Sequence, residues 1–249
     1  TDVVSLMASD FKEWILSSGM QPELQERFQN WDGSMKGDMI EPLIFHAWYR
    51  ELTKLLYSDE LGNNFEQAWE RRSKFVTQAL KYNTAWCDNV TTNSPENCKQ
   101  IIEKAWENAI AWLIQRYGTR REDWEWERAH IARHKHAAFS GIPVLGELFD
   151  ITHSHDGGPY TVMQANTTLR NEKTPFEENH GAALRVIFDL SNLDNTHIMI
   201  STGQSGNRLS EHYASLSSSW KKGEYINLPM SLEGVREATR ERLSLVPEP

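Results

Sequence analysis

Residues 201–213, STGQSGNRLSEHY, bring together a serine and a histidine that could act as nucleophile and general base. Ser205 would attack and His212 would take its proton. The nucleophile elbow of hydrolases has the pattern G-x-S-x-G within a strand–turn–helix. Here Gly206 follows Ser205 directly, one residue too early, and no helical pattern follows at once. The pattern therefore disfavours a serine catalyst on this loop.

The first residue is a second candidate nucleophile. A free N-terminal threonine can attack with its own amine as the base. Such a nucleophile usually sits on a strand edge facing a cleft, whereas Thr1 leads directly into an amphipathic helical pattern. The local sequence therefore argues against catalysis by Thr1.

Three histidines in HIARHKH could bind a metal ion. His130 and His134 are four residues apart, so on a helix they would share a face and could hold zinc, with His136 nearby. The HExxH form is absent because Ile131 stands where the glutamate would be. We expect structural or solvated histidines and no metal, with a metal hydrolase as the weaker alternative.

A second polar cluster lies in DITHSHDGG, residues 150–158, which contains His153, His155 and Asp156. It could be a metal or acid–base cluster. It could equally be a polar turn before a strand, with glycines chosen for backbone freedom. We favour the turn.

The elements that must position these residues change in character along the chain. Helical spacing of apolar residues covers residues 1–19, where Asp2 could cap the start and Gly19 end the helix. It recurs over 42–57, 64–82 and 98–117, the last before Gly118. Strand patterns occupy residues 157–168, 182–190 and 197–203, and the stretch from Ser231 is polar and helical.

These patterns predict an α+β protein in which the spacing of apolar residues changes from helical to strand-like near residues 140–146. We expect a helical lobe over 1–139, strands and loops over 140–230, and a C-terminal helix and tail over 231–249. Three short strands make a sheet with little core and open edges. The chain is therefore expected to complete a sheet whose other strands lie on another chain or segment.

Composition narrows the class of partner. The 249 residues carry a net charge of -9 without a basic stripe, which disfavours nucleic acid. No run of eighteen apolar residues is present, which disfavours a membrane span.

Cys87 and Cys98 flank a polar loop and are expected to form a disulfide, the alternative being two free thiols. Such a bond suits an oxidising compartment.

Taken together, the motifs resemble a known family. They are NWDGSM, PLIFHAWYREL, WEWERAHIARHKH, GGPYTV, GAALRVIFDL and GQSGNRLSEHY followed by W..GEY, in that order. The series is similar to the C-terminal part of the β-chain of penicillin amidases, which are N-terminal-nucleophile hydrolases. This group includes penicillin, cephalosporin, aculeacin and acyl-homoserine-lactone acylases. The resemblance covers about residues 2–229.

The resemblance implies an enzyme whose chemistry is elsewhere. Family precursors cut themselves into an α-chain and a β-chain, and the serine that begins the β-chain is the nucleophile. The expected partners are therefore the α-chain and the N-terminal part of the β-chain, with a small-molecule amide as substrate. The family's calcium ligands also belong mainly to that absent part, and this chain alone is expected to be inactive.

Within this chain the resemblance implies one residue near the chemistry. Some members have a carboxylate on the strand matching AALRVIFDL that orients a histidine near the nucleophile, and Asp189 is the best match. Strand alternation would put Arg185, Ile187 and Asp189 on one face. The plain alternative is a strand-end aspartate that caps a turn or pairs with Arg185. The resemblance also implies that GQSGN is a structural loop and that His212 and Tyr213 pack.

The resemblance and the disulfide imply a periplasmic or secreted protein, although no signal peptide is recognisable at Thr1. A rival hypothesis is a complete, non-catalytic binding module with tryptophan-lined surfaces. A module should fold alone as a monomer, whereas a fragment should expose a large apolar surface and need its partners.

Overall fold

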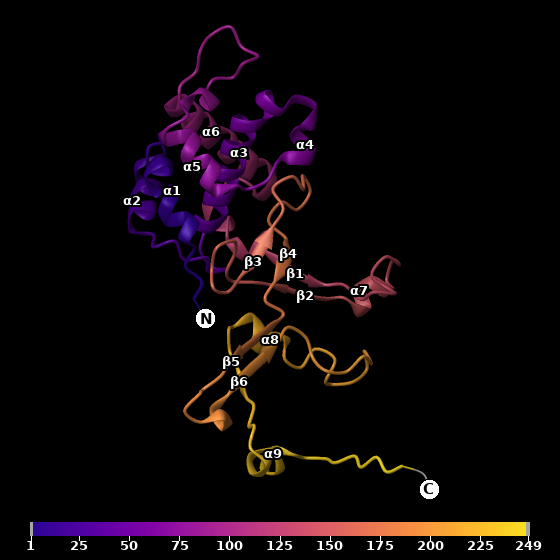
Figure 1. Ribbon diagram of the computed structural model, residues 1–249. Helices are drawn as coiled ribbons and strands as arrows, with labels where there is room; N and C mark the ends of the chain where they lie inside the picture. The colour runs from indigo at the N-terminus through magenta and orange to yellow at the C-terminus, as the bar shows by residue number, and fades with distance from the viewer. Residues whose placement is uncertain (1, 248–249) are drawn as a thin grey trace. The chain divides into compact units, whose positions relative to one another are not determined.

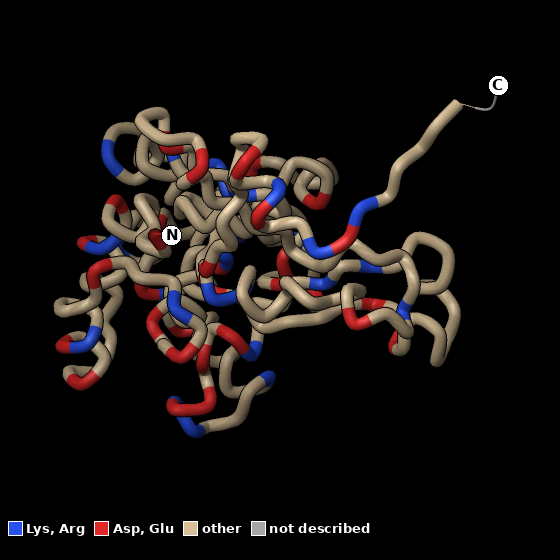
Figure 2. The backbone as a smooth tube through the Cα atoms, turned by 90° about the horizontal axis from the view of Figure 1, so that it is seen from below, with Lys and Arg blue, Asp and Glu red and all other residues tan. Residues whose placement is uncertain are grey.

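The computed structural model describes residues 2–247 of the chain. Backbone contacts divide it into two compact units, residues 1–181 (unit 1) and residues 182–249 (unit 2). Basic and acidic residues are interspersed along the backbone (Figure 2). Among the described residues, none of the helices combines the length and apolar character needed to cross a bilayer.

Unit 1 consists of helices followed by short strands (Figure 1). The α-helices are α1 (Leu6–Leu16), α2 (Pro22–Asn30), α3 (Glu41–Leu61), α4 (Phe65–Ala68), α5 (Ser73–Lys81), α6 (Cys98–Tyr117) and α7 (Leu145–Phe149). The 3-10 helices are η1 (Gly62–Asn64), η2 (Thr84–Cys87), η3 (Arg121–Asp123) and η4 (Trp126–Arg128). Strands β1 (Ile131–His134) and β2 (Ile151–Ser154) form one antiparallel pair, and β3 (Ala165–Thr167) and β4 (Glu178–Gly181) form another.

Unit 2 is a small antiparallel sheet with short helices. Its sheet has the order β5 (Leu184–Ile187), β6 (His197–Ile200) and β7 (Ile226–Asn227). The helices are η5 (Leu193–Asn195), α8 (Ser217–Lys221) and α9 (Leu232–Ala238). The expected mixture of helices and strands is therefore confirmed, as helices plus small antiparallel sheets.

Helix α3 is the central helix of unit 1. Every residue from Glu41 to Thr53 is buried, so the helix is enclosed on all sides. The buried Arg50 is paired with Glu51 at 2.9 Å and with Glu172 at 2.7 Å. Such pairing is needed because an unpaired charge in a core is very unfavourable. The helix expected over 42–57 is confirmed.

Helix α6 packs against α3 and matches the expected helix over 98–117 (Figure 1). Asn97 and Gln100 form a capping box at its start, and Gly118, with φ 88°, ends it. Cys98 also forms the expected disulfide with Cys87, the two Cα atoms lying 4.9 Å apart. The start of α6 is thus joined covalently to η2.

The first expected helix is shorter than its pattern. Helix α1 begins at Leu6, and the Asp2 carboxylate accepts from the backbone N–H of Val4 at 2.8 Å. Asp2 therefore does not cap α1. Gly19 adopts φ 79° beyond the end of the helix, as a chain-turning glycine should.

The single helix expected over 64–82 is wrong, because the chain breaks between α4 and α5. The indole of Trp69 donates to Thr53 Oγ1 at 3.0 Å, and the carbonyl of Arg71 accepts from the Tyr49 hydroxyl. Arg72 has φ 36°, which a helix cannot contain. Tertiary hydrogen bonds to α3 override the local helical pattern here.

Two further expectations about secondary structure are wrong. The change from helical to strand patterns, expected near residues 140–146, comes earlier, because Ile131–His134 is strand β1. Residues 151–154, expected in a turn, are strand β2. The strand expected over 157–168 shrinks to Ala165–Thr167, because the Thr161 hydroxyl and Gly158 form local turn contacts instead.

Candidate functional site

The β1–β2 pair places four histidines on one face. Ala132 pairs with His153, and beyond the ladder the backbone N–H of His155 donates to the His130 carbonyl at 3.0 Å. Alternate strand residues and directly paired residues share a face. His130 and His134 therefore lie on the same side as His153 and His155. The ring centres of His130 and His155 are 5.8 Å apart, and those of His134 and His153 are 6.4 Å apart.

His130 is fully buried and held in one orientation. Its ring stacks on Trp126 at 4.5 Å, and its Nδ1 lies 2.8 Å from the Phe176 carbonyl oxygen. A carbonyl only accepts, so Nδ1 carries the proton and Nε2 the lone pair. Burial lowers the pKa of His130 to about 4, so the ring is neutral at pH 7. Nε2 is buried with no hydrogen-bond partner among the described residues.

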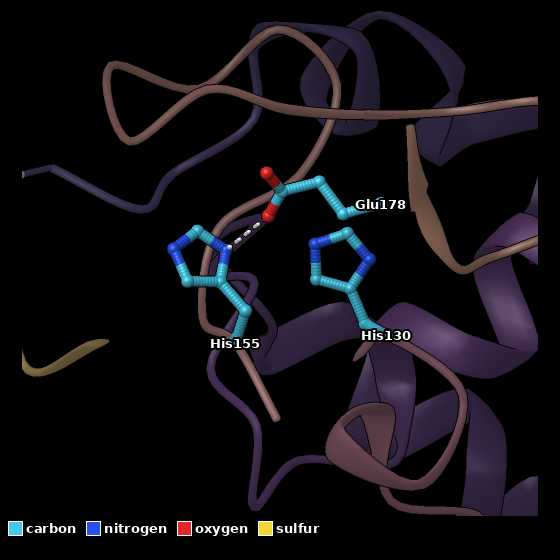
Figure 3. Close-up of side chains that lie close together, drawn as sticks. All are labelled: His130, His155 and Glu178. Atoms are coloured by element: carbon cyan, nitrogen blue, oxygen red, sulfur yellow. Dashed lines mark ion pairs between the residues drawn. The ribbon is translucent and has the colours of Figure 1, made fainter. Parts of the chain in front are cut away.

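His155 and Glu178 form a buried pair beside His130. His155 Nδ1 lies 3.2 Å from Glu178 Oε2, and the two side chains are 0% and 8% exposed. Figure 3 shows the His130 ring turning a nitrogen toward this pair. The Glu178 carboxylate occupies the space that a Cβ at position 181 would fill, so Gly181 makes room for it.

His130, His155 and Glu178 each offer one ligand atom, and these atoms all lie within 4.8 Å of one another. Two imidazoles and a carboxylate can hold a divalent ion or exchange a proton. The site takes one histidine from each of the two histidine clusters in the sequence. Glu178 was missed because the packing of β4 against β1 brings it here, and no spacing in the sequence signals that contact.

The remaining members of those clusters lie elsewhere. The His136 ring stacks on Phe139 at 4.8 Å. Among the residues that the structure describes, His130, His134 and His136 do not form a group that could hold one ion. Asp156 Oδ1 accepts from the backbone N–H of Gly37 at 2.7 Å and ties two loops together. His134 lies beside His153, and burial lowers its pKa.

His46 links helix α3 to the cluster. Its ring is fully buried and stacks at 4.9 Å on Trp126, which also stacks on His130. Burial, followed by the positive charge of Arg71, lowers the pKa of His46 well below its usual value. The histidine is therefore a neutral part of the core at pH 7.

Asp189 lies in a turn of unit 2, past the end of β5 at Ile187. Its Oδ1 accepts from the backbone N–H and the hydroxyl of Ser191, at 2.9 and 2.6 Å, and from the backbone N–H of Asn192. Its Oδ2 accepts from the Asn195 side chain at 3.3 Å. These bonds, led by that of the Ser191 hydroxyl, lower the pKa of Asp189 to about 2.

Arg185 does not pair with Asp189 in the described contacts. Its guanidinium lies 4.8 Å from the centre of the Trp220 ring and donates to the Trp220 carbonyl at 2.8 Å. The turn-capping alternative for Asp189 therefore matches the geometry. Its longer bond at Oδ2 leaves that oxygen with capacity for a further donor.

The loop containing Ser205 and His212 is folded on itself. The backbone N–H of Ser205 donates to the His212 carbonyl at 3.2 Å, and a Cβ at Gly203 would collide with that carbonyl. Ser205 Oγ accepts from the backbone N–H of Asn207, and the His212 side chain is 68% exposed. Thr1 lies outside the described residues.

A comparison with protein families decides which family this is. The sequence profile described as penicillin amidase matches residues 1–237. The chain belongs to the penicillin amidase family. The family resemblance of the ordered sequence motifs is thereby confirmed.

Relatives within the penicillin amidase family include two acylases named for acyl-homoserine lactones. Acyl-homoserine lactone acylase QuiP of Pseudomonas putida is 24% identical over 99% of this chain and 33% of its own length. QuiP of Pseudomonas aeruginosa is 26% identical over 90% of this chain and 29% of its own. The penicillin acylase 2 proenzyme of a Pseudomonas strain is 23% identical over 90% of this chain and 29% of its own length.

The family fold is also seen in a solved structure. Thermostable penicillin G acylase from Alcaligenes faecalis superposes with a TM-score of 0.58 at 16% identity, covering 100% of this chain and 48% of that one. At this identity the likeness concerns the fold alone. The chain spans about a third of the length of the curated relatives it matches.

Proposed function

We propose that this chain is part of a penicillin-amidase-family acylase that hydrolyses a linear amide. One observation carries the proposal: the family profile covers residues 1–237, while the chain spans about a third of its relatives. The substrate class would be an amide whose amine is a β-lactam nucleus or a homoserine lactone. This choice follows the relatives' names, penicillin acylase and acyl-homoserine lactone acylase.

The chemistry would come from a serine that begins another segment of the enzyme. Its own amine would act as the base, and attack on the amide carbonyl would give an acyl-enzyme that water hydrolyses. Backbone and side-chain donors on that segment would stabilise the oxyanion. This chain would supply the helical lobe and strands that complete an αββα sandwich, with the α-chain and the N-terminal part of the β-chain as partners.

The apolar surface of unit 2 supports a role as a completing piece. Within the described residues, β5 has a strand neighbour only on its β6 side. Large apolar side chains around it are exposed: Leu184 at 60%, Phe188 at 57% and Leu190 at 87%. Open strand edges beside exposed apolar side chains are typical of surfaces that another chain or segment covers.

We also propose that Asp189 positions a histidine near the nucleophile. Its lowered pKa keeps the carboxylate charged at neutral pH, and Oδ2 has capacity for an imidazole N–H. In this role Asp189 acts through the histidine, fixing its tautomer and orientation.

We further propose a periplasmic or secreted location, with any calcium bound by the other segments. The disulfide between Cys87 and Cys98 supports an oxidising compartment. A disulfide alone is compatible with either location.

The proposal is tested by adding back the missing segments. The full chain should hydrolyse neither a phenylacetyl amide nor an N-acyl-homoserine lactone by itself. Mixed or co-expressed with the α-chain and the serine-bearing part of a relative, it should co-purify and restore hydrolysis. The matched control is the same partner with its first serine changed to alanine, which should assemble and remain inactive. Hydrolysis by the chain alone would refute the proposal.

Asp189 is tested in the same assembled enzyme. Asp189→Asn should lower kcat by roughly 10- to 100-fold with little change in KM, the size expected when a residue orienting another loses its charge. It should also alter the pH profile of kcat. Asp194→Asn is the matched control, because the Asp194 carboxylate likewise accepts several hydrogen bonds, here from Met230 and Ser231 at the start of α9. If both variants lose the same stability and keep kcat unchanged, Asp189 does not position the histidine and only stabilises its own turn.

A further inference from the structure

We propose that unit 1 binds one zinc-class divalent ion through His130 Nε2, His155 Nδ1 and Glu178 Oε2. The site is separate from the acylase chemistry proposed above and does not depend on it. Its three ligands come from the residue before β1, the residue after β2 and the first residue of β4.

The donor set selects the kind of ion. Two imidazole nitrogens and one carboxylate oxygen form a ligand set that zinc uses in proteins. Calcium and magnesium prefer sites made of oxygen atoms, so a site with two nitrogens disfavours both. Three protein ligands also leave a fourth tetrahedral position for water or another small ligand.

His130 is oriented as a metal ligand would be. Metal-binding histidines usually donate their other ring N–H to a carbonyl or carboxylate, which fixes the tautomer. Here the Phe176 carbonyl accepts from Nδ1 at 2.8 Å, and Trp126 stacks on the ring. The remaining nitrogen, Nε2, is buried without a hydrogen-bond partner among the described residues. A lone pair buried in this way is unfavourable unless something binds it.

The spacing of the ligand atoms needs only a small closure. They lie within 4.8 Å of one another. Two ligands bonded to one zinc ion at about 2.1 Å each can be at most about 4.2 Å apart. A change of rotamer at Glu178 would supply the difference, with the carboxylate leaving the space that it now occupies against Gly181. The ion would replace the direct contact between His155 and Glu178 shown in Figure 3.

A bound ion would connect two sheets that share no strand in unit 1. His130 and His155 extend the β1–β2 ladder, whereas Glu178 begins β4, which pairs with β3. The ion would therefore hold the β3–β4 pair against the β1–β2 pair. It should stabilise unit 1 in proportion to the logarithm of the free ion concentration over its Kd.

The test measures metal binding by the full chain, together with any polypeptides that purify with it. After treatment with a chelator, the protein is dialysed against Zn²⁺ in the presence of millimolar Mg²⁺ and Ca²⁺. We expect one Zn²⁺ per chain, and a higher melting temperature with Zn²⁺ than without it. With Co²⁺ we expect visible absorption bands of a four-coordinate site.

Three variants locate the ion. His155→Gln and Glu178→Gln should each weaken Zn²⁺ binding by at least about 100-fold. A loss of about that size is the upper end of what is seen when a residue that only holds a metal ligand in place is removed. His180→Gln is the matched control, because His180 is an exposed histidine on the same strand as Glu178. It should bind Zn²⁺ like the parent chain.

Two results would overturn the proposal. The first is less than one Zn²⁺ per parent chain at saturating concentration, which needs no variant to interpret. The second is unchanged Zn²⁺ affinity in both His155→Gln and Glu178→Gln. Circular dichroism of each metal-free variant, compared with the parent chain, separates loss of binding from loss of folding.

Discussion

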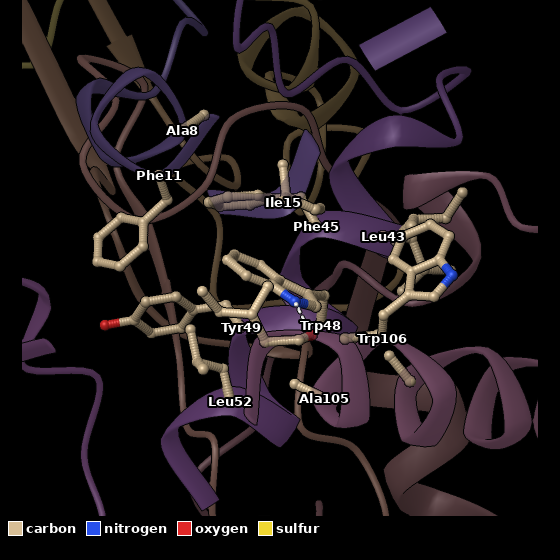
Figure 4. Close-up of a cluster of buried hydrophobic side chains, with 14 of the residues drawn as sticks. Ala8, Phe11, Ile15, Leu43, Phe45, Trp48, Tyr49, Leu52, Ala105 and Trp106 are labelled. Atoms are coloured by element: carbon tan, nitrogen blue, oxygen red, sulfur yellow. Dashed lines mark hydrogen bonds between the residues drawn. The ribbon is translucent and has the colours of Figure 1, made fainter. Parts of the chain in front are cut away.

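The core of unit 1 and the sheet of unit 2 differ in how completely they cover their apolar side chains. In unit 1, residues of α3 pack against α1 and α6, with Phe45, Trp48 and Tyr49 all fully buried (Figure 4). The Trp48 indole donates to the Ile102 carbonyl of α6 at 3.3 Å. This core is built entirely from residues of the same unit.

Unit 2 has a much smaller interior. Met199 and Trp220 are fully buried, and the Trp220 indole donates to the Ala182 carbonyl at 2.9 Å. Its strands have at most four residues, and many large apolar side chains around them are exposed. A small sheet needs three or more strands with a hydrophobic face, or packing against a helix, for independent stability. Unit 1 therefore resembles a self-sufficient core, and unit 2 resembles part of a larger one.

The largest effect should come from the core of unit 1. Trp48→Ala should lower the free energy of unfolding by about 3–5 kcal/mol, because it leaves a cavity in the core where α3 packs against its neighbouring helices. Chemical denaturation followed by circular dichroism measures the change. Tyr82→Ala is the control, since Tyr82 is 76% exposed, and should change stability by less than about 0.5 kcal/mol. Equal losses in the two variants would contradict the enclosed core.

The disulfide should have the next largest effect. Replacing Cys87 and Cys98 together by alanine should lower the free energy of unfolding by about 3 kcal/mol, because the unfolded chain gains freedom. Comparison of the melting curves of parent and variant, each with and without reducing agent, measures it. Reducing agent should shift only the parent curve, and a parent curve that does not respond would refute the expectation.

Acid should weaken unit 1 through His46. The folded pKa of His46 lies well below its unfolded value, near 6.5, so the unfolded chain binds more protons as the pH falls. Stability is therefore fully present above pH 6.5 and falls below it, by about 1 kcal/mol from this residue between pH 6.5 and 5.5. Denaturation at both pH values, in the presence of a chelator, measures the change. His46→Leu should reduce this pH dependence, and an unchanged slope would refute the assignment.

The smallest effect on stability should come from the exposed surface of unit 2. Phe188→Ser and Leu190→Ser should each change the free energy of unfolding of the chain alone by no more than about 0.5 kcal/mol. The same variants should weaken assembly with the partner segments, measured by co-purification and native mass spectrometry. Unchanged assembly in both variants would show that this surface does not contact the partner segments. The exposed apolar side chains of unit 2 would then not be explained by a partner that covers them.

Sequence reasoning succeeded where periodicity and tertiary packing agree. Helices α3 and α6 were predicted because their apolar spacing is regular and Gly118 stands at the end of α6. It failed between α4 and α5, where the Tyr49 hydroxyl and the Thr53 side chain hold the chain out of a helix. Such bonds join residues about twenty positions apart, so no local pattern reveals them.

The histidine site shows a different limit. A spacing of four residues puts His130 and His134 on one face of a helix and equally on one face of a strand, so spacing alone did not separate the two. The pairing of β1 with β2 decided the matter by bringing His130 to His155. Glu178 depends on a third strand, and its recruitment could not be predicted without the tertiary structure.

The bond between Cys87 and Cys98 also determines how the chain would respond to a protease. The loop between them is polar and largely exposed, which makes it a natural place for cleavage. A cut anywhere from residue 88 to residue 97 would leave both pieces joined through the sulfurs. The nicked protein would keep its full mass under oxidising conditions and separate into two bands only after reduction.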